Sequence, residues 1–150
     1  MVMTQLPQDF KEFLKLLTLH EVKYLLIGGY AVSYHGYLRA TADMDLWIAI
    51  EPQNAEKLVT VLREFGFGVP ELTPDLFLNK DKVIRMGLPP LRIEILTTIS
   101  GVDFDECYSE RIVGIIDGVE VNIISLKHLK INKKASGRYK DFDDLEHLGS

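Results

Sequence analysis

The segment LLIGGYAVSYHGYLRATADMDLWIAI, residues 25–50, constrains the fold of this chain more than any other stretch. It contains two apolar runs, and both are bounded by residues that a buried strand does not favour. Gly28 and Gly29 end the first run, and Asp43 and Asp45, separated by one methionine, begin the second. Adjacent glycines lose backbone entropy on folding, and carboxylates resist burial. The segment therefore predicts a glycine turn and a carboxylate pair at the edges of two hydrophobic strands.

Composition limits the class of protein. A chain of 150 residues can close one hydrophobic core, and 47% apolar with 26% charged residues is typical of a globular protein. The net charge of −5 gives no bulk reason to expect nucleic-acid or membrane binding, although local basic patches are compatible with it. The longest apolar runs are too short to span a bilayer, and the N-terminus lacks a signal-peptide pattern. We expect one domain, residues 1–150, and no membrane partner.

The single cysteine, Cys107, has no partner for an internal disulfide. This favours a reducing, cytoplasmic location. Because no paired histidine is evident, we expect Cys107 to be a small core or surface residue rather than a nucleophile.

Hydrophobic periodicity predicts both helices and strands. An amphipathic stripe follows Pro7, and Asp117-Gly118 is a favoured two-residue hairpin turn. We expect strands at 22–27, 45–50, 82–86, 91–96 and on both sides of the turn within 111–124. We expect helices after Pro7, through 31–32 until near Gly36, from 52 to Gly66, at 73–78, from Leu126 to about Ser136 after a Ser125 cap, and over 138–148. These elements form one α+β (α/β) domain whose largely mixed sheet is flanked by helices.

Asp43 and Asp45 are the first candidates for chemistry. Alternate residues of a strand share a face, with Cα atoms about 6.7 Å apart, so these side chains project in the same direction. Two carboxylates at such a short distance repel each other, unless a cation lies between them or water solvates both. A solvated turn at the start of the strand is the plainer explanation, because Asp is common there and Asp-x-Asp alone is a weak signal.

Two further features favour a ligand site. Gly28 and Gly29 lie where a strand passes into a helix, a position that suits phosphate as well as a simple tight turn. Glu94 lies in LRIEIL, where residues 91, 93 and 95 are expected to be buried and Glu94 to face the other way. A lone strand glutamate is usually solvated. If its strand neighbours 45–50, however, three carboxylates gather beside a phosphate-binding turn, which suits Mg²⁺ and nucleotide chemistry.

Three motifs, in order, resemble the polymerase-β-like nucleotidyltransferase superfamily, and within it the small standalone prokaryotic members, including abortive-infection toxin-type and uncharacterised nucleotidyltransferases. GGYAVSYHGYLRATADMDLWI is similar to their GG-x-AV, HG and R-x-T-x-D-x-D block. RIEILTTISGVDF resembles their third-carboxylate strand, and SLKHLKINKKASGRYKDFDDLEHL their C-terminal segment. The resemblance covers about residues 22–148 and implies the nucleotidyltransferase fold.

The resemblance also implies roles for these residues. Gly28 and Gly29 would hold the nucleotide phosphates, and Asp43 and Asp45 would bind metal ions. Glu94 would bind a second metal and help to deprotonate the attacking hydroxyl. Two Mg²⁺ ions would stabilise the attacking and leaving oxygens of an in-line displacement that releases pyrophosphate. The family usually has Asp at the third position, and Glu94 is one methylene longer.

Several other residues keep two interpretations. Arg39 can contact phosphate or pair with a carboxylate, and Lys133 and Arg138 can bind the triphosphate or form a solvated charged face. His35 is expected to be a turn or packing residue. Trp47 shares a strand face with the aspartates, but core packing is favoured over base stacking. Thr41 is expected to hydrogen-bond the turn before the strand.

The sequence therefore predicts a metal-dependent nucleotidyltransferase that moves a nucleoside monophosphate from an NTP to a hydroxyl acceptor. The acceptor can be an RNA 3′ end, a protein side chain or a small molecule. A toxin-type role would add an antitoxin partner, and a homo-oligomer is also compatible. The alternative is a nucleotide-binding or regulatory module of the same fold that has lost turnover.

Overall fold

A computed structural model describes residues 6–38, 41–88 and 91–149 of the chain. The helical elements are α1 (Gln8–Leu19), α2 (Gly28–Tyr34), α3 (Pro52–Phe65), the 3₁₀ turn η1 (Pro74–Phe77), α4 (Phe104–Ser109), α5 (Leu126–Ser136) and α6 (Tyr139–Leu148). The strands are β1 (Tyr24–Ile27), β2 (Asp43–Ile48), β3 (Val83–Leu88), β4 (Leu91–Leu96), β5 (Ile112–Ile116) and β6 (Val119–Ile123). The element types follow the sequence expectation closely.

The strands form one mixed sheet in the order β3-β4-β2-β1-β6-β5. Two hairpins, β3–β4 and β5–β6, form its edges, and β1 and β2 pair antiparallel at the centre. The pairs β2–β4 and β1–β6 are parallel, so the mixed α+β sheet predicted from the sequence is confirmed. The arrangement places β2 between β1 and β4. Polar residues on β2 therefore have neighbours on two strands.

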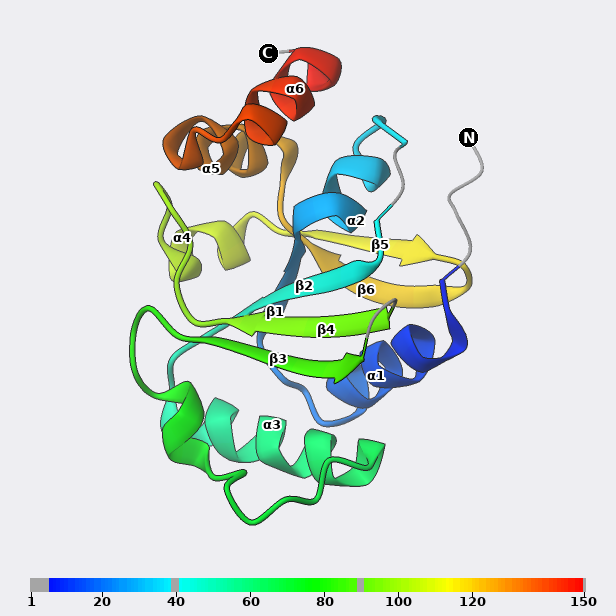
Figure 1. Cartoon of the computed structure of the whole chain (residues 1–150), viewed down its shortest axis with the longest axis vertical. Coiled ribbons are helices and arrows are strands. Elements are labelled where there is room, and N and C mark those ends of the chain that lie inside the picture. The colour runs from blue at the N-terminus through cyan, green and yellow to red at the C-terminus, as the bar shows by residue number, and fades with distance from the viewer. Residues whose placement is uncertain (1–5, 39–40, 89–90, 150) are drawn as a thin grey trace.

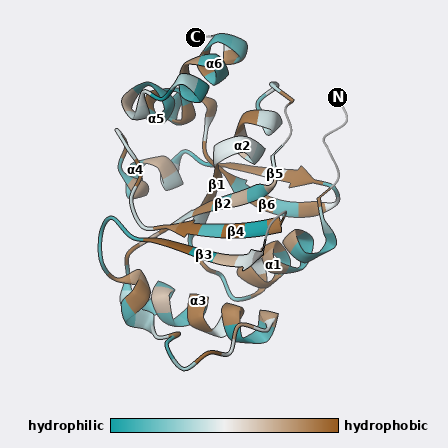
Figure 2. Cartoon of the chain, in the orientation of Figure 1, coloured by the Kyte–Doolittle hydropathy of each residue, from teal (hydrophilic) through white to brown (hydrophobic). Residues whose placement is uncertain are grey.

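The helices lie on opposite sides of the sheet. In Figure 1, α1 and α3 lie below it, and α5 and α6 lie above it. Both lower helices are amphipathic, with hydrophobic and hydrophilic patches alternating along them in Figure 2. Phe10, Phe13, Leu14 and Leu17 of α1 are buried, as their spacing predicted. The left-handed Gly66 ends α3, also as predicted. This apolar layer covers one face of the sheet, and Asp43, Asp45 and Glu94 project from the other.

The strand boundaries differ from the sequence expectation for identifiable reasons. β1 begins at Tyr24 rather than at 22, because the amides of Val22 and Lys23 bond to Leu17 and to the Asn54 side chain (3.0 and 2.7 Å) instead of to a strand. β2 runs from 43 to 48 rather than from 45 to 50. Its ladder with β4 extends through Asp43, because Arg92 stands opposite on the neighbouring strand.

Three smaller expectations are also corrected. Residues 73–78 form a 3₁₀ turn, and Thr73 makes no side-chain cap. Leu91, expected on the buried face, is 39% exposed because it begins β4 beside the hairpin turn. Helix α4 was not predicted, although Asp103 caps its amide at Glu106 (3.5 Å) and apolar residues recur at i, i+3 and i+4. Such a short element gives too few residues for periodicity to stand out.

Cys107 lies in the core on α4, with 1% of its surface exposed. Burial, and then the charge of Glu106, raises the pKa of its thiol to about 12. A thiol of this kind stays protonated and is a poor nucleophile, in agreement with the packing role expected from the sequence. None of the helices described, over residues 6–38, 41–88 and 91–149, combines the length and apolar character needed to cross a bilayer.

Candidate nucleotide and metal site

Close packing between two glycines and the start of β2 builds the floor of the candidate site. Gly28 begins α2 with a φ of +67°, and a Cβ placed on it would lie 2.2 Å from Asp45 Oδ2. A Cβ on Gly29 would lie 2.7 Å from Thr41 Oγ1. Real side chains never approach so closely, and a positive φ is itself strained for other residues. Both glycines are therefore required by the fold, whatever their role toward phosphate.

Thr41 fixes the turn that leads into β2. Its hydroxyl donates a hydrogen bond to the backbone carbonyl of Asp43 (3.2 Å), the role expected from the sequence. The Thr41 hydroxyl thus packs against Gly29, where a side chain would clash with it, and also orients Asp43. The spacing Gly-Gly followed by Thr-x-Asp-x-Asp describes one packed unit rather than two separate motifs.

The three predicted carboxylates lie side by side on neighbouring strands. In the parallel register of β2 and β4, Asp43 stands opposite Arg92, and Asp45 stands opposite Glu94. Alternation along both strands directs Asp43, Asp45 and Glu94 to the same face, while Met44 and Ile93 between them are buried. The structure thus brings Glu94 to the aspartates, which the sequence could state only as a condition.

Two arginines pair with the outer members of this carboxylate cluster. Arg92 donates from Nε and Nη2 to the two oxygens of Asp43 (3.3 and 3.1 Å). Arg85 of β3 donates from Nε to Glu94 Oε1 (3.0 Å). Neither arginine was assigned a role from the sequence. The available signal was the alternation of LRIEIL, which placed Arg92 on the face of Glu94.

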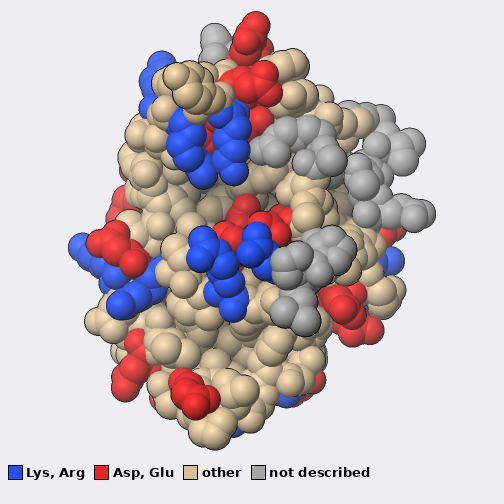
Figure 3. All heavy atoms as spheres, viewed as in Figure 1, with Lys and Arg blue, Asp and Glu red and all other residues tan. Residues whose placement is uncertain are grey.

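The carboxylates line a cavity of about 500 Å³, which also borders both glycines and the segment that joins α5 to α6. Figure 3 shows acidic side chains recessed in a hollow at the centre of one face, with Lys and Arg side chains above and below. A cleft with an acidic floor and a basic rim suits a ligand that combines cations with a polyanion.

Asp45 is the most perturbed group of the cleft. Burial first, then the charge of Glu94, a hydrogen bond with Glu94 and the charge of Asp43, raise the pKa of Asp45 to about 7. Lys140 opposes the increase. When Asp45 is protonated, the repulsion among the three neighbouring carboxyl groups is reduced without a cation.

The α5–α6 junction carries the other two predicted ligands, but both are engaged within the protein. Lys133 is buried, and its ammonium lies 3.1 Å from Asp141 and 3.0 Å from Asp144. Arg138 is exposed and forks onto Asp141 at 2.8 and 3.2 Å. Burial would raise the pKa of Asp141, but hydrogen bonds led by Arg138 outweigh it and hold that pKa below its usual range. Phosphate binding by Lys133 and Arg138 stays a prediction.

Lys140 offers a cation that the sequence expectation did not single out as a ligand. It is exposed, lines the same cavity, and its charge acts on Asp45. It lies two residues after Arg138, which pairs with Asp141. Arg39, the other basic residue predicted to contact phosphate, lies outside the described residues.

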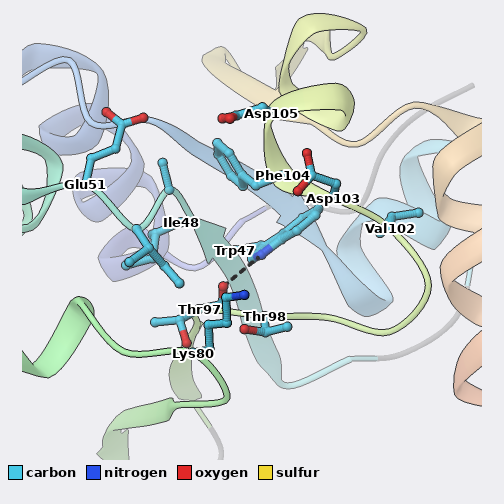
Figure 4. A pocket seen from close by; sticks show the side chains of 12 residues that line it. Trp47, Ile48, Glu51, Lys80, Thr97, Thr98, Val102, Asp103, Phe104 and Asp105 are labelled. Carbon is cyan, nitrogen blue, oxygen red and sulfur yellow. Dashed lines mark hydrogen bonds between the residues drawn. The ribbon is translucent and has the colours of Figure 1, made fainter.

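His35 and Trp47 take structural positions. His35 ends α2, and its Nε2 lies 2.8 Å from the carbonyl oxygen of Ile124. Trp47 is 2% exposed, donates its indole N–H to the carbonyl of Thr97 (3.3 Å) and packs edge-on against Phe104. Figure 4 shows this ring at the wall of a second cavity, of about 390 Å³. Core packing of Trp47 is confirmed, and its faces are not presented for base stacking.

The donor set of the cleft fits a hard divalent cation. Its floor consists of carboxylate oxygens, the ligands that Mg²⁺ prefers, and the backbone is held close by Gly28. Burial, and then the negative charges of Glu94 and Asp43, raise the pKa of Asp45, and a bound cation would offset those charges. Asp43, Asp45 and Glu94 are the residues that would hold it.

The raised pKa of Asp45 predicts an unusual pH dependence of stability in metal-free buffer. In the unfolded chain Asp45 ionises at about pH 4, whereas in the folded protein it keeps its proton up to about pH 7. The folded state therefore binds more protons in this window, and Asp45 makes the free energy of unfolding fall as pH rises from about 4 to about 7. Asp45→Asn should flatten this part of the curve and make the metal-free protein more stable than wild type above pH 7.

Urea unfolding at a series of pH values, in the presence of a chelator, measures the effect. Glu71→Gln, an exposed carboxylate-to-amide change away from the cleft, is the matched control and should follow wild type. Equal slopes for wild type and Asp45→Asn would contradict the prediction.

Known proteins resemble this chain in family and in fold. A family described as "Nucleotidyltransferase of unknown function (DUF6036)" matches residues 3–149. The fold is similar to the crystal structure of an antigenic nucleotidyltransferase-like protein from Paracoccidioides brasiliensis, with a TM-score of 0.54 and 17% identity over 97% of this chain and 78% of that chain. No curated protein gives a significant match. The resemblance predicted from the sequence is confirmed at the level of family and fold. Because the family match spans nearly the whole chain, the protein belongs to this family of nucleotidyltransferases of unknown function.

Proposed function

We propose that the protein transfers a nucleoside monophosphate from an NTP to a hydroxyl acceptor, with Mg²⁺ bound at the carboxylate cluster. The observation that carries the proposal is the meeting of Asp43, Asp45 and Glu94 on adjacent strands, beside the Gly28-Gly29 turn, in one cleft. Paired metal ions held this way stabilise the charge that develops on a phosphoryl group and on its leaving pyrophosphate.

Each part of the cleft has a role in this proposal. Asp43 and Asp45 anchor the cation, and the bare backbone at Gly28 and Gly29 lets the triphosphate approach without a side chain between. Glu94 accepts the proton of the attacking hydroxyl, and its place opposite Asp45 in the β2–β4 register directs it toward the cleft. Lys140 binds a phosphate oxygen as a point charge at the rim.

The α5–α6 junction would position these groups. Lys133 lies between Asp141 and Asp144 and holds the two helices together beneath the rim. Truncating one member of such a buried pair leaves an uncompensated charge, which is strongly destabilising. Arg138 completes the junction at the surface, and reaching a phosphate requires it to share its guanidinium with Asp141.

The acceptor is proposed only as a class. A basic rim of Arg85, Arg138 and Lys140 around an acidic floor is compatible with an RNA 3′ end, a protein side chain or a small hydroxyl compound. A toxin-type role, with a cognate antitoxin, is one physiological setting compatible with the resemblance to toxin-type members. Testing each acceptor class with the same NTP separates these alternatives.

One observation favours a second candidate, a nucleotide-binding module with little turnover. Arg92 and Arg85 already satisfy Asp43 and Glu94, so a cation must compete with two guanidinium groups. Glu94 also has one methylene more than the aspartate usual in the polymerase-β-like superfamily that the sequence resembles. In this case NTP would bind and pyrophosphate would not be released.

Pyrophosphate release from each NTP, with and without Mg²⁺ and with RNA, protein and small-molecule acceptors, distinguishes the two candidates. We expect Mg²⁺-dependent release by wild type, and a loss of at least about 10²-fold in Asp45→Asn and in Glu94→Gln, because charge stabilisation by such groups has that magnitude. Glu71→Gln is again the control and should keep full activity. NTP binding without release under every condition would favour the non-catalytic module.

Lys140→Ala should weaken NTP binding about 10-fold or more, since charge-assisted hydrogen bonds contribute about 1.5–3 kcal/mol. The melting temperature should hardly change, because the side chain is exposed. Lys134→Ala removes an exposed lysine of the same segment that does not line the cleft, and serves as the control. Calorimetric titration of an NTP analogue gives both affinities. Equal affinity for the Lys140 variant and wild type would remove Lys140 from the site.

A further inference from the structure

A second group of metal-ligating side chains lies where α4 meets the start of α5. Glu106 and Glu110 stand one helical turn apart, and His128 comes from the first turn of α5. One donor atom from each residue lies within 4.8 Å of the other two. None of these three residues lines the cleft that holds Asp45.

His128 is the unusual member of the group. Only 1% of its surface is exposed, and its Nε2 has no hydrogen-bond partner among the described residues. This nitrogen is directed toward Glu106 Oε1 at 3.6 Å and Glu110 Oε2 at 3.9 Å, both beyond hydrogen-bonding distance. A buried polar atom without a partner costs free energy. Its position therefore calls for an additional partner.

The opposite ring nitrogen is already fixed. Nδ1 of His128 lies 3.0 Å from Ser125 Oγ, and the same hydroxyl oxygen accepts a hydrogen bond from the backbone amide of His128 at 3.2 Å. Metal-binding histidines commonly have their second nitrogen held in this way, which sets the ring orientation. The N-cap of α5 thus directs Nε2 between the two glutamates.

We propose that Glu106, Glu110 and His128 form a site for a divalent transition metal of the zinc class, separate from the Mg²⁺ site of the cleft. Imidazole together with carboxylates suits such ions, whereas Mg²⁺ prefers oxygen ligands alone. Two ligands of a tetrahedral Zn²⁺ lie roughly 3.3–3.6 Å apart. The observed separations of 3.6 and 3.9 Å need only a small movement of the exposed glutamates.

The surroundings define what the ion must displace. Lys127 Nζ lies 3.2 Å from Glu110 Oε1, and the oxygen nearer His128 is the other one, Oε2. Binding can therefore use Oε2 while Lys127 keeps Oε1. Three protein ligands leave a fourth position for water. An ion here would tie α4 to α5, the helix that carries Lys133 beside the cleft.

A competing arrangement is a protonated His128 that forms two long ion pairs. In that arrangement the three side chains bind no metal, so a metal titration distinguishes it from the proposed site. Co²⁺ replaces Zn²⁺ in such sites and gives visible absorption bands characteristic of tetrahedral coordination. An excess of Mg²⁺ keeps the carboxylates of the cleft occupied during the titration.

The experiment titrates the chelator-treated full chain with Co²⁺ and then with Zn²⁺. We expect one equivalent of Co²⁺ with tetrahedral bands, displaced by Zn²⁺. The double variant Glu106→Gln and Glu110→Gln changes only exposed side chains and should bind at least about tenfold more weakly, since even outer-shell changes weaken metal sites by that amount. His128→Gln should abolish the bands. If this buried substitution prevents folding, the double glutamine variant still tests the site.

Two controls complete the design. Asp45→Asn, in the cleft, and Glu71→Gln, on the surface, should both retain the Co²⁺ bands. Absence of binding by wild type, or bands retained in the double glutamine variant, would overturn the second site. Bands lost in Asp45→Asn would assign the ion to the cleft and would also overturn it. Activity is not the readout, so failure of the proposed transferase would leave this result interpretable.

Discussion

The contact between the Asp45 carboxylate and the backbone of Gly28 is the constraint on which the rest of the site depends. Any side chain at Gly28 would overlap that carboxylate, and the residue has a left-handed φ besides. The antiparallel pairing of β1 and β2 sets Asp45 opposite Ile27, the last residue before the turn. The end of β1, the start of α2 and the polar half of β2 are thus fixed together. One packing arrangement therefore leaves the backbone of Gly28 accessible to a phosphate and the carboxylate of Asp45 accessible to a cation.

Charge balance is the second determinant of the cleft. Three carboxylates on adjacent strands repel, and in the metal-free protein the repulsion is reduced in two ways. Arg92 and Arg85 pair with the outer members, and Asp45 keeps a proton up to about pH 7. A cation that enters must release that proton and compete with the arginines, so its affinity should rise with pH. A bound triphosphate would then provide an alternative partner for the displaced guanidinium groups.

Much of the fold and part of the site followed from the sequence, for reasons that particular residues make clear. Phe10, Phe13 and Leu17 predicted α1 because burial of one face repeats at helical spacing. Asp43 and Asp45 predicted a shared direction because alternation in a strand is local. The position of Glu94 depended on which strand pairs with β2, a long-range choice that local pattern does not encode.

The contacts that the sequence did not predict share the same origin. The charged run predicted that Lys133 either binds the triphosphate or lies on a solvated face, but folding buries it between two carboxylates eight and eleven residues later. Arg92 acquired its partner only through the β2–β4 register. Nothing in the sequence pattern singled out His128, because its proximity to Glu106 arises from the packing of α4 on α5. Patterns within one element were predictable, whereas pairing between elements was not.

The central claim is that the carboxylate cluster and the glycine turn bind one metal–nucleotide complex. The most direct measurement is a crystal structure with Mn²⁺ and a non-hydrolysable NTP analogue, in which anomalous scattering locates the metal. We expect Mn²⁺ in contact with Asp43 and Asp45, the triphosphate against Gly28 and Gly29, and Arg92 moved away from Asp43. An intact Arg92–Asp43 pair, with no Mn²⁺ at these carboxylates and the nucleotide bound elsewhere, would contradict it.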